Sequence, residues 1–160
     1  MKEYAEEIIP IIRGNAPDSL VIVGTPNWSQ DIDISASDRL TGDIAVNTLY
    51  AVHFYADTHT QWLRDRVVAA IEDGMPVFFS EFGTCDASGN GANNFVEAEA
   101  WLELADQYDI SYCMWNLSNK DETSSIISPD VQILSGWSDS ELTETGRWYK
   151  NRLLSYDPAE

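Results

Sequence analysis

A chain of 160 residues with 44% hydrophobic and 11% aromatic residues can bury the core of one domain of ordinary size, which excludes a disordered protein. Nine Lys and Arg residues stand against 27 Asp and Glu residues, so the formal net charge is −18. A field of that sign repels phosphate backbones and anionic membranes, and we expect neither nucleic acid nor a membrane as a partner. Solubility or adaptation to salt explains the charge without any partner.

The cysteines and the apolar runs exclude two further classes. Cys85 and Cys113 have neither CxxC nor metal-ligand spacing, so no zinc or redox motif is present, and a disulfide between them is left open. No apolar run reaches the roughly 18 residues of a membrane-spanning helix. The N-terminus lacks the basic and apolar regions of a signal peptide, so we expect no targeting signal in these 160 residues.

The first predicted elements are one helix and two strands. Residues 2–15 place apolar side chains at helical spacing despite Pro10, and Gly14 favours an end to that helix. Residues 19–25 are a short β-branched run, which predicts a strand buried on both faces. Residues 47–56 form a second run of the same kind.

Helices and strands then alternate to the end of the chain. The remaining elements are expected as a helix at 59–74, a strand at 76–82, a helix at 93–109, a strand at 110–118 and a helix at 142–154. Gly74 and Pro76 stop the first of these helices, and Asn94 and Glu97 have the spacing of a capping box at the start of the second. Trp62, Trp101 and Trp148 lie in helical patterns, which indicates packing.

This order predicts an α/β protein with a parallel sheet. Strands recur at a period near 30 residues, and no hairpin dipeptide joins two of them, so the crossovers should be right-handed. Both a doubly wound sheet and part of a (β/α)8 barrel fit that pattern. The Gly-rich phosphate loop of a nucleotide-binding doubly wound fold is missing.

Polar and aromatic side chains gather where the predicted strands end. Because side chains alternate along a strand, three pairs should each share one face: His53 with Tyr55, Phe79 with Glu81, and Cys113 with Trp115. Ligands bind at the carboxyl ends of parallel strands in barrels and open sheets alike. We therefore expect one rim that carries these side chains, joined by Trp28 from the loop after the first strand.

The stretch PVFFSEFGTCD, residues 76–86, runs an apolar strand directly into Glu81. An unpaired buried charge is costly, so this carboxylate should be paired, protonated or placed at an opening. A carboxylate among aromatic rings is typical of a sugar site, and a hydrogen bond from Tyr55 would favour its ionised form. The residues alone leave simpler roles open, with Glu81 capping a loop, His53 bonded in the core and His59 beginning a helix.

Five segments carry a family resemblance: VGTPNWSQD, HFYADTHTQWLRDRV, PVFFSEFGTCDASGNG, CMWNLSNKDE and LTETGRWYK. In this order they resemble successive parts of a glycoside hydrolase family 5 endoglucanase of the cellulase type, over essentially all 160 residues. The family more often has Trp at the position of Phe82. The resemblance implies a secreted enzyme that acts on β-glucan and needs no cofactor or metal.

The resemblance also implies a role for particular residues. Glu81 matches the catalytic nucleophile at the end of barrel strand seven, and His53 and Tyr55 match a pair on strand six beside it. Trp115 matches the aromatic floor under the sugar at the cleavage point. The remaining substrate contacts would be Trp28 on the leaving-group side, with Lys120 and Glu122 on the non-reducing side.

One catalytic segment of the family is not found. The family's general acid/base is a Glu in an NEP segment that ends strand four, whereas residues 1–160 contain no NEP. Residues 1–10 resemble the helix after that strand. The resemblance therefore implies a single C-terminal half-barrel domain, residues 1–160, with strands five to eight and weak or no activity alone.

Four strands would leave two open edges and an exposed apolar face, so we expect a partner. A second copy (a homodimer) or the missing N-terminal half would complete an eight-stranded barrel. Two other functions stay open, a non-catalytic carbohydrate-binding module and a self-assembling half-barrel. The preference among cellulose, mixed-linkage glucan and mannan is also open.

Overall fold

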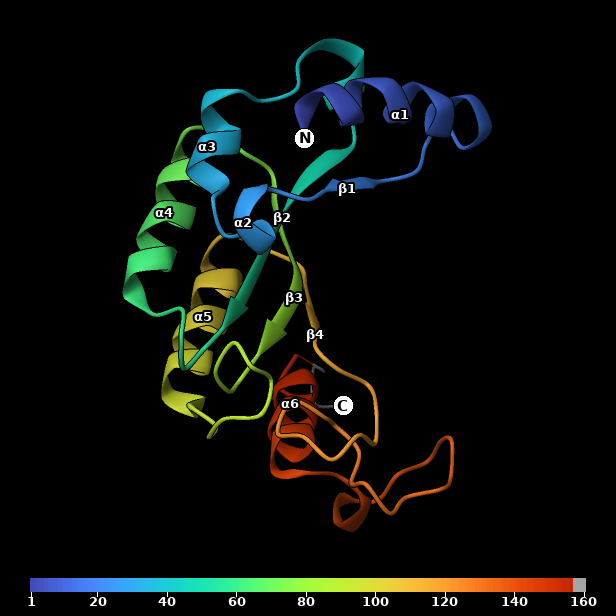
Figure 1. Cartoon of the computed structure of the whole chain (residues 1–160), viewed down its shortest axis with the longest axis vertical. Coiled ribbons are helices and arrows are strands. Elements are labelled where there is room, and N and C mark those ends of the chain that lie inside the picture. Colours follow the sequence, from blue (N-terminus) through green and yellow to red (C-terminus); the bar gives the residue numbers. More distant parts are fainter. Residues whose placement is uncertain (157–160) are drawn as a thin grey trace.

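In the computed structural model, which describes residues 1–156, four strands form one parallel sheet in the order β1-β2-β3-β4. The strands are β1 (Val21–Val23), β2 (Thr48–Tyr55), β3 (Val77–Gly83) and β4 (Tyr112–Met114). Each strand after β1 pairs with the strand before it in the chain (Figure 1), so the predicted parallel α/β fold is confirmed. Residues 157–160, which belong to the expected domain, lie outside the described part.

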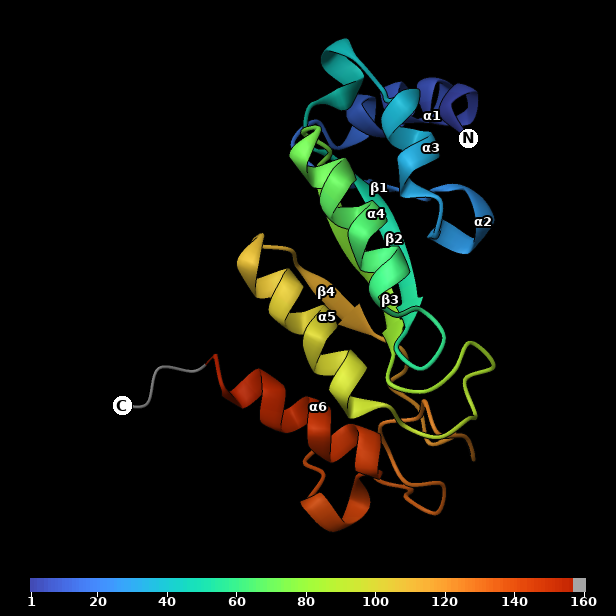
Figure 2. The same ribbon diagram turned by 90° about the vertical axis from the view of Figure 1, so that its left-hand side faces the viewer.

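The helices are α1 (Lys2–Asn15), α2 (Pro26–Ser29), α3 (Ile32–Ser37), α4 (Gln61–Glu72), α5 (Phe95–Gln107) and α6 (Glu144–Leu154), with 3-10 turns at Gly42–Ala45 and Asp139–Glu141. The predicted helices are confirmed within two residues at each end. α2 and α3 were not predicted, because four and six residues are too few to show a helical period. Figure 2 shows α4 and α5 side by side over the same face of the sheet.

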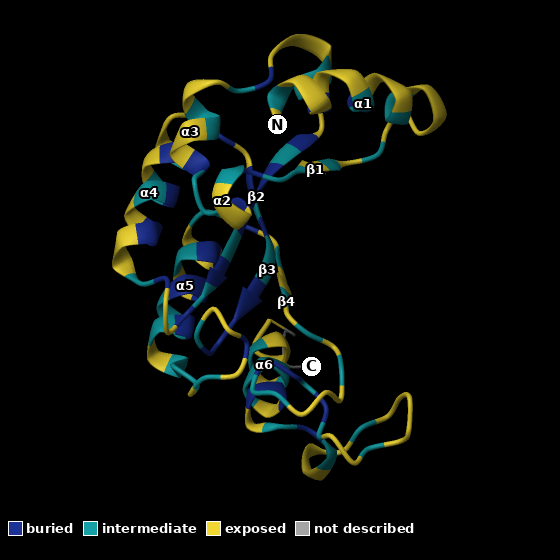
Figure 3. Ribbon diagram, viewed as in Figure 1, coloured by how far each residue is buried: buried dark blue, intermediate teal, exposed yellow. Residues whose placement is uncertain are grey.

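The core lies between that face and the helices (Figure 3). The Trp101 ring of α5 stacks on Phe54 of β2 with 4.1 Å between centroids. Phe79 and Phe82 of β3 lie 5.3 Å and 5.1 Å from the same Phe54 ring, and all four side chains are fully buried. Aromatic pairs of this geometry stabilise a core beyond the area that they bury.

The predicted capping box at α5 is half formed. The Asn94 side chain accepts the Glu97 backbone N–H at 3.1 Å, as predicted for an N-cap. The Glu97 carboxylate does not complete the box, because it pairs with Arg64 of α4 at 2.7 Å. The acidic side chain therefore ties α5 to α4.

The first strand differs from its prediction. β1 pairs with β2 on one side only and is the edge of the sheet, and Ile22 in its middle is 43% exposed. The expectation of a strand buried on both faces is therefore wrong for β1. A groove of about 510 Å³ between α1 and β1 is lined almost wholly by apolar side chains, among them Tyr4, Ile8 and Ile22.

An irregularity in β3 overturns one of the three expected face pairings. Ala51 and His53 of β2 pair with Phe78 and Glu81 of β3, so the register shifts by one residue between them. As a result Phe79 packs in the helix-facing core, whereas Glu81 contacts Tyr55 on the opposite face. The prediction that Phe79 and Glu81 share a face is wrong, since strict alternation does not hold across a bulge.

Candidate active site

Glu81 faces a cavity at the carboxyl ends of β2 and β3. The cavity, about 530 Å³ in volume, is lined by Trp28, Gln30, His53, Tyr55, His59, Glu81 and Ala87. The Glu81 side chain keeps 26% of its surface exposed, so the carboxylate lies in the wall of an opening and is not sealed in the core. The structure thus brings Glu81, His53, Tyr55 and Trp28 together as expected from the sequence.

Tyr55 holds the Glu81 carboxylate from the neighbouring strand. The Tyr55 hydroxyl donates a hydrogen bond to Glu81 Oε1 at 2.9 Å. Burial and this bond raise the pKa of Tyr55 well above its usual value, so the phenol stays protonated and remains a donor. A hydrogen bond to a carboxylate is roughly twice as strong as one between neutral groups, and it fixes the direction in which Glu81 points.

His53 lies beside the same carboxylate without a hydrogen bond to it. His53 Nδ1 is 3.7 Å from Glu81 Oε2, whereas Nε2 is 2.9 Å from the Ser80 hydroxyl. Burial lowers the pKa of His53, although the Glu81 charge acts in the opposite direction. His53 is therefore a mostly neutral polar group that borders the cavity.

His59, for which no catalytic role was predicted, also lines the cavity. His59 Nδ1 accepts the Tyr55 backbone N–H at 2.8 Å, so the neutral ring carries its proton on Nε2. Burial lowers the pKa of His59. Gln30 and Ala87 were also missed, although both lie in loops that follow strand ends, where ligand-binding residues concentrate.

Trp28 projects from the connection after β1. Trp28 is 82% exposed, yet it forms part of the cavity wall. Asn27, Trp28 and Ser29 all have positive φ angles, of 55°, 51° and 61°, which is unusual for residues other than glycine. An indole presented in this way is a flat apolar surface suited to the C–H face of a sugar ring.

Trp115 follows β4 and is 47% exposed. Its backbone N–H donates to the Phe82 carbonyl at 2.8 Å, which joins it to the residue after Glu81. The side chain is not part of the wall of the Glu81 cavity, so the structure brings the Trp115 backbone to the site without placing its ring in that wall.

Lys120 and Glu122 lie in the loop between β4 and α6. They form an ion pair, and the Glu122 carboxylate also accepts hydrogen bonds from Ser124 at 2.9 Å and Asn116 at 3.2 Å. The Lys120 bond, followed by that of Ser124, lowers the pKa of Glu122. Like Trp115, these two side chains are outside the Glu81 cavity.

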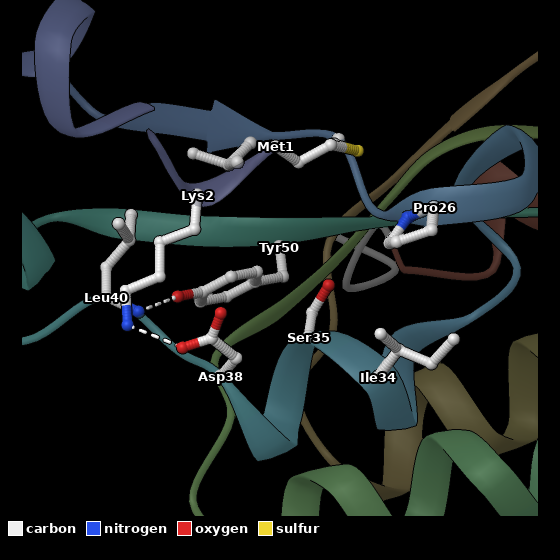
Figure 4. A pocket seen from close by; sticks show the side chains of 10 residues that line it. Met1, Lys2, Pro26, Ile34, Ser35, Asp38, Leu40 and Tyr50 are labelled. Carbon is white, nitrogen blue, oxygen red and sulfur yellow. Dashed lines mark hydrogen bonds and ion pairs between the residues drawn. The ribbon is translucent and has the colours of Figure 1, made fainter. Parts of the chain in front are cut away.

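A second, smaller cavity of about 140 Å³ lies near the N-terminus and β1 (Figure 4). Among its polar side chains, Lys2 pairs with Asp38 at 2.6 Å, and the Tyr50 hydroxyl accepts the Leu40 backbone N–H at 2.7 Å. Tyr50 is three residues before His53 in β2, so the two side chains lie on opposite faces of the sheet. Tyr50 belongs to the buried core on the helix-facing side. This cavity therefore contributes nothing to the Glu81 site.

The described residues contain neither a cluster of metal ligands nor a disulfide between the two cysteines. Within residues 1–156 no three His, Cys, Asp or Glu side chains are arranged to hold a metal ion. Cys85 and Cys113 are free, and burial raises the pKa of Cys85 to about 11. None of the helices in residues 1–156 has the length and apolar character to cross a membrane.

The arrangement has a definite chemical capacity. A carboxylate held by a phenol at a cavity wall can attack an electrophilic carbon or stabilise positive charge that develops there. Among the residues that line the cavity in the described part, Glu81 is the one carboxylate. A reaction that needs a second carboxyl group must obtain it from elsewhere.

Comparison with known proteins gives relatives over almost the whole chain. Endoglucanase A of Evansella cellulosilytica is 40% identical over 153 residues, and Endoglucanase A of Butyrivibrio fibrisolvens is 42% identical over 154 residues. Each alignment covers 96% of this chain but only 31% and 35% of the relative. The chain therefore spans about a third of the length of these curated relatives.

Solved structures give the same result for the fold. A structure from Cytophaga hutchinsonii superimposes with a TM-score of 0.91 at 39% identity, covering 96% of this chain and 49% of the other. Endoglucanase Cel5A of Thermobifida fusca, solved with cellotetraose, superimposes with a TM-score of 0.85 at 32% identity, covering 96% of this chain and 52% of the other. The four-stranded sheet thus matches part of a larger cellulase fold.

The family assignment follows from the sequence profile as well as from these relatives. Residues 1–121 match the profile described as cellulase, glycosyl hydrolase family 5. That match covers more than half of the 160 residues and includes the whole wall of the Glu81 cavity. The resemblance seen in the sequence is therefore confirmed, and this chain belongs to glycosyl hydrolase family 5.

Proposed function

We propose that this chain supplies the nucleophile and much of the sugar-binding cleft of a retaining endo-β-1,4-glucanase. The observation that carries the proposal is the Glu81 carboxylate, which faces a cavity and accepts the Tyr55 hydroxyl at 2.9 Å. A Glu81 oxygen forms a bond to the anomeric carbon of a glucosyl unit as the glycosidic C–O bond breaks. The leaving oxygen takes the bonding electron pair, and water later hydrolyses the glycosyl-enzyme.

Two neighbours support the attack without taking part in it. Tyr55 orients the Glu81 carboxylate through its hydrogen bond, and His53 borders the reacting centre with its ring 3.7 Å from Glu81 Oε2. Both side chains come from β2, whose pairing with β3 fixes their distance from the carboxylate. Rigid placement of this kind is a major source of catalytic rate.

The substrate is proposed to be cellulose or a related β-glucan. The relatives are endoglucanases, and one similar structure was solved with cellotetraose. Trp28 would stack on the leaving-group side, Trp115 would lie under the sugar at the cleavage point, and Lys120 and Glu122 would bind hydroxyl groups on the non-reducing side. Because the family that the sequence resembles is secreted, we also propose that the protein acts outside the cell.

The leaving oxygen needs a proton, and this chain offers no positioned donor for it. Retaining enzymes place their two carboxyl groups about 5 to 5.5 Å apart. Glu81 is the one carboxylate in the described cavity wall, and residues 1–160 contain no NEP segment. We propose that the general acid/base is supplied by a segment outside these residues. Its loss typically lowers the rate about 10²- to 10⁴-fold, so this chain alone should hydrolyse cellulose weakly or not at all.

The fold is proposed to be one C-terminal half-barrel, with β1 to β4 as strands five to eight. Two features support a partner at its edges: β1 is unpaired on one side, and the groove between α1 and β1 exposes Tyr4 and Ile22. A second copy or the N-terminal half of the enzyme would cover these surfaces. In light scattering, twice the 17.9 kDa of the chain supports the homodimer. A monomer that also fails to bind a separately expressed N-terminal half contradicts both partners.

The proposed nucleophile is best tested with a substrate that needs no acid. In 2,4-dinitrophenyl 2-deoxy-2-fluoro-β-cellobioside the dinitrophenolate leaves without a proton, and the fluorine slows hydrolysis of the glycosyl-enzyme. Incubation with the 160-residue chain should add one 2-fluorocellobiosyl group to the intact mass, and peptide mapping should place it on Glu81. The Glu81→Gln variant should acquire no label.

Glu103→Gln is the matched control, because it changes an exposed carboxylate on α5 that lies outside the cavity and has no proposed role in binding. It should be labelled like the wild type at saturating reagent. Labelling at a residue other than Glu81 contradicts the proposed mechanism. Binding of cello-oligosaccharides without any labelling favours the non-catalytic carbohydrate-binding module, and rapid cellulose hydrolysis by the purified chain contradicts the proposed need for an external acid.

A further inference from the structure

Gly83 lies directly against the tyrosine that holds Glu81. It pairs with Tyr55 across β2 and β3 and is two residues after Glu81, on the same cavity-facing side of the strand. A Cβ atom added at Gly83 would be 2.5 Å from Tyr55 Cδ1 and 2.6 Å from Cε1. The Tyr55 ring therefore lies across the position that any side chain at residue 83 would occupy.

The backbone does not explain this glycine. The residues with positive φ angles include Gly42, Gly74, Gly89 and Gly136 but not Gly83, so an L-residue could adopt the Gly83 conformation without strain. The close approach of the Tyr55 ring is what excludes a side chain. Gly83 is the last residue of β3, where a glycine gives up side-chain packing and costs conformational entropy, and this argues for a specific use of the open space.

We propose that Gly83 is a positioning residue for the Glu81 reaction. Because Gly83 has no side chain, the Tyr55 ring can pack against its Cα, and in this position the Tyr55 hydroxyl reaches the Glu81 carboxylate. The inference rests on the proposed function of Glu81. Ordinary contact with a Cβ begins at 3.4 Å, so an alanine would push the ring away by about 1 Å. A hydroxyl now 2.9 Å from Oε1 would then leave hydrogen-bond distance.

Tyr55 has little freedom to restore the bond by another route. Its backbone N–H is held by His59 Nδ1 at 2.8 Å, and its backbone carbonyl accepts the His59 N–H at 2.8 Å. The strand end therefore stays fixed, and only the ring can move. Displacement of the ring and loss of the Glu81 bond are thus the same event.

The test is a double-mutant cycle on the labelling reaction with the dinitrophenyl fluorocellobioside. Gly83→Ala and Tyr55→Phe should each lower the maximal labelling rate about 10- to 100-fold, the range for a lost hydrogen bond to a charged group. The reagent concentration that gives half-maximal rate should change less than the rate. Adding Gly83→Ala to Tyr55→Phe should lower the rate by less than about threefold, because the hydroxyl is already gone.

Gly14→Ala is the matched control, since a Cβ there meets nothing within 4 Å. This absence of neighbours holds for residues 1–156, and the variant should be labelled at the wild-type rate. Wild-type labelling by Gly83→Ala, or additive losses in the double variant, overturns the inference. Where Gly83→Ala does not fold, Gly83→Ala with Tyr55→Ala should fold as well as Tyr55→Ala alone, and failure of this rescue also overturns it.

A second measurement separates this inference from the identity of the nucleophile. Burial and the Glu81 bond raise the pKa of Tyr55, so Gly83→Ala should move its titration down toward the ordinary tyrosine range, as followed by NMR of ¹³Cζ-labelled tyrosine. If no protein is labelled but the titration moves, the proposed function fails and the positioning contact stands. If the wild type is labelled and the titration of Gly83→Ala does not move, the positioning contact is overturned.

Discussion

On the helix-facing side of β3, Phe79 and Phe82 are fully buried against the Phe54 and Trp101 rings. On the cavity-facing side of the same strand, Glu81 is 26% exposed and Gly83 has no side chain at all. A register shift between Phe78 and Glu81 places Phe79 on the helix-facing side and Glu81 on the cavity-facing side. Seven residues thus contribute both to the core and to a polar cavity.

The difference shows how one strand can serve stability and chemistry through separate contacts. The helix-facing rings exclude water and gain packing energy, which accounts for most of the stability of a domain. The cavity-facing groups are joined by hydrogen bonds that contribute about 0.5 to 3 kcal/mol each and keep the carboxylate accessible. Substitutions on the helix-facing side should therefore lower stability most, and substitutions on the cavity-facing side should act mainly on the site.

The largest effect is expected from Phe79→Ala. Phe79 is fully buried and packs edge-on against both Phe54 and Trp101. Removing the ring leaves a cavity in the core, so the free energy of unfolding should fall by about 3–5 kcal/mol in urea denaturation. A loss that large could exceed half of the stability of the chain.

Phe78→Ala is the matched control on the other face. Phe78 is adjacent in β3, is only partly buried and pairs with Ala51 before the register shift. The decrease in the free energy of unfolding should be smaller for Phe78→Ala than for Phe79→Ala by at least about 2 kcal/mol. Equal losses from the two variants would contradict the separation of the two faces.

The next effect concerns pH and His59. Burial places the folded-state pKa of His59 below its unfolded value, so the unfolded chain binds the proton first as the pH falls. Stability is therefore fully present above about pH 6.5 and is lost as the pH falls toward the lower folded-state pKa, with a slope of at most about 1.4 kcal/mol per pH unit.

The matched variant for this effect is His59→Asn, whose side-chain oxygen can still accept the Tyr55 N–H. Urea denaturation between pH 7 and pH 5 should show a smaller loss of stability in the variant than in the wild type. An identical pH dependence of the two proteins would show that the His59 ring is as easily protonated in the fold as in the unfolded chain.

Much of this site could be predicted from the sequence because strand ends have a fixed geometry. The apolar runs before Tyr55 and Glu81 place both residues at the carboxyl edge of a parallel sheet, and their hydrogen bond was expected from that position. The motif around Glu81 also supported the family assignment. The placement of these side chains needed only periodicity, strand order and residue type, whereas the family assignment needed the resemblance of the five segments to a known family.

The rest depended on features that have no period. The register shift in β3 separated Phe79 from Glu81, and a single extra residue leaves no mark in an apolar run. His59 was missed because a turn, not a strand, brings its ring to the cavity. β1 was expected to be buried on both faces because an apolar run has the same composition whether one of its faces is covered or, as at Ile22, exposed.

A smaller effect is expected from Ser80→Ala, which lies in the shifted segment. The Ser80 hydroxyl is 2.9 Å from His53 Nε2 and is the contact that joins the shift to the cavity wall. Its removal should lower the free energy of unfolding by about 1 kcal/mol, as for a typical partly buried hydrogen bond. Ser135→Ala, in an exposed loop, is the control and should change it by less than about 0.5 kcal/mol. A Ser80 effect within the control range would mean that His53 does not depend on the shift.

The smallest effect is expected from Lys120→Met. The Lys120 side chain is 71% exposed, so its ion pair with Glu122 is screened by water and should contribute at most about 0.5 kcal/mol to folding. Glu122 keeps its bonds from Ser124 and Asn116 in the variant, which leaves its carboxylate in place. If Lys120 binds a sugar hydroxyl as proposed, the affinity for cellotetraose measured by calorimetry should fall severalfold, as for a hydrogen bond of about 1 kcal/mol, while the free energy of unfolding falls by at most about 0.5 kcal/mol. Loss of stability with unchanged affinity would assign Lys120 to the fold and remove it from the proposed cleft.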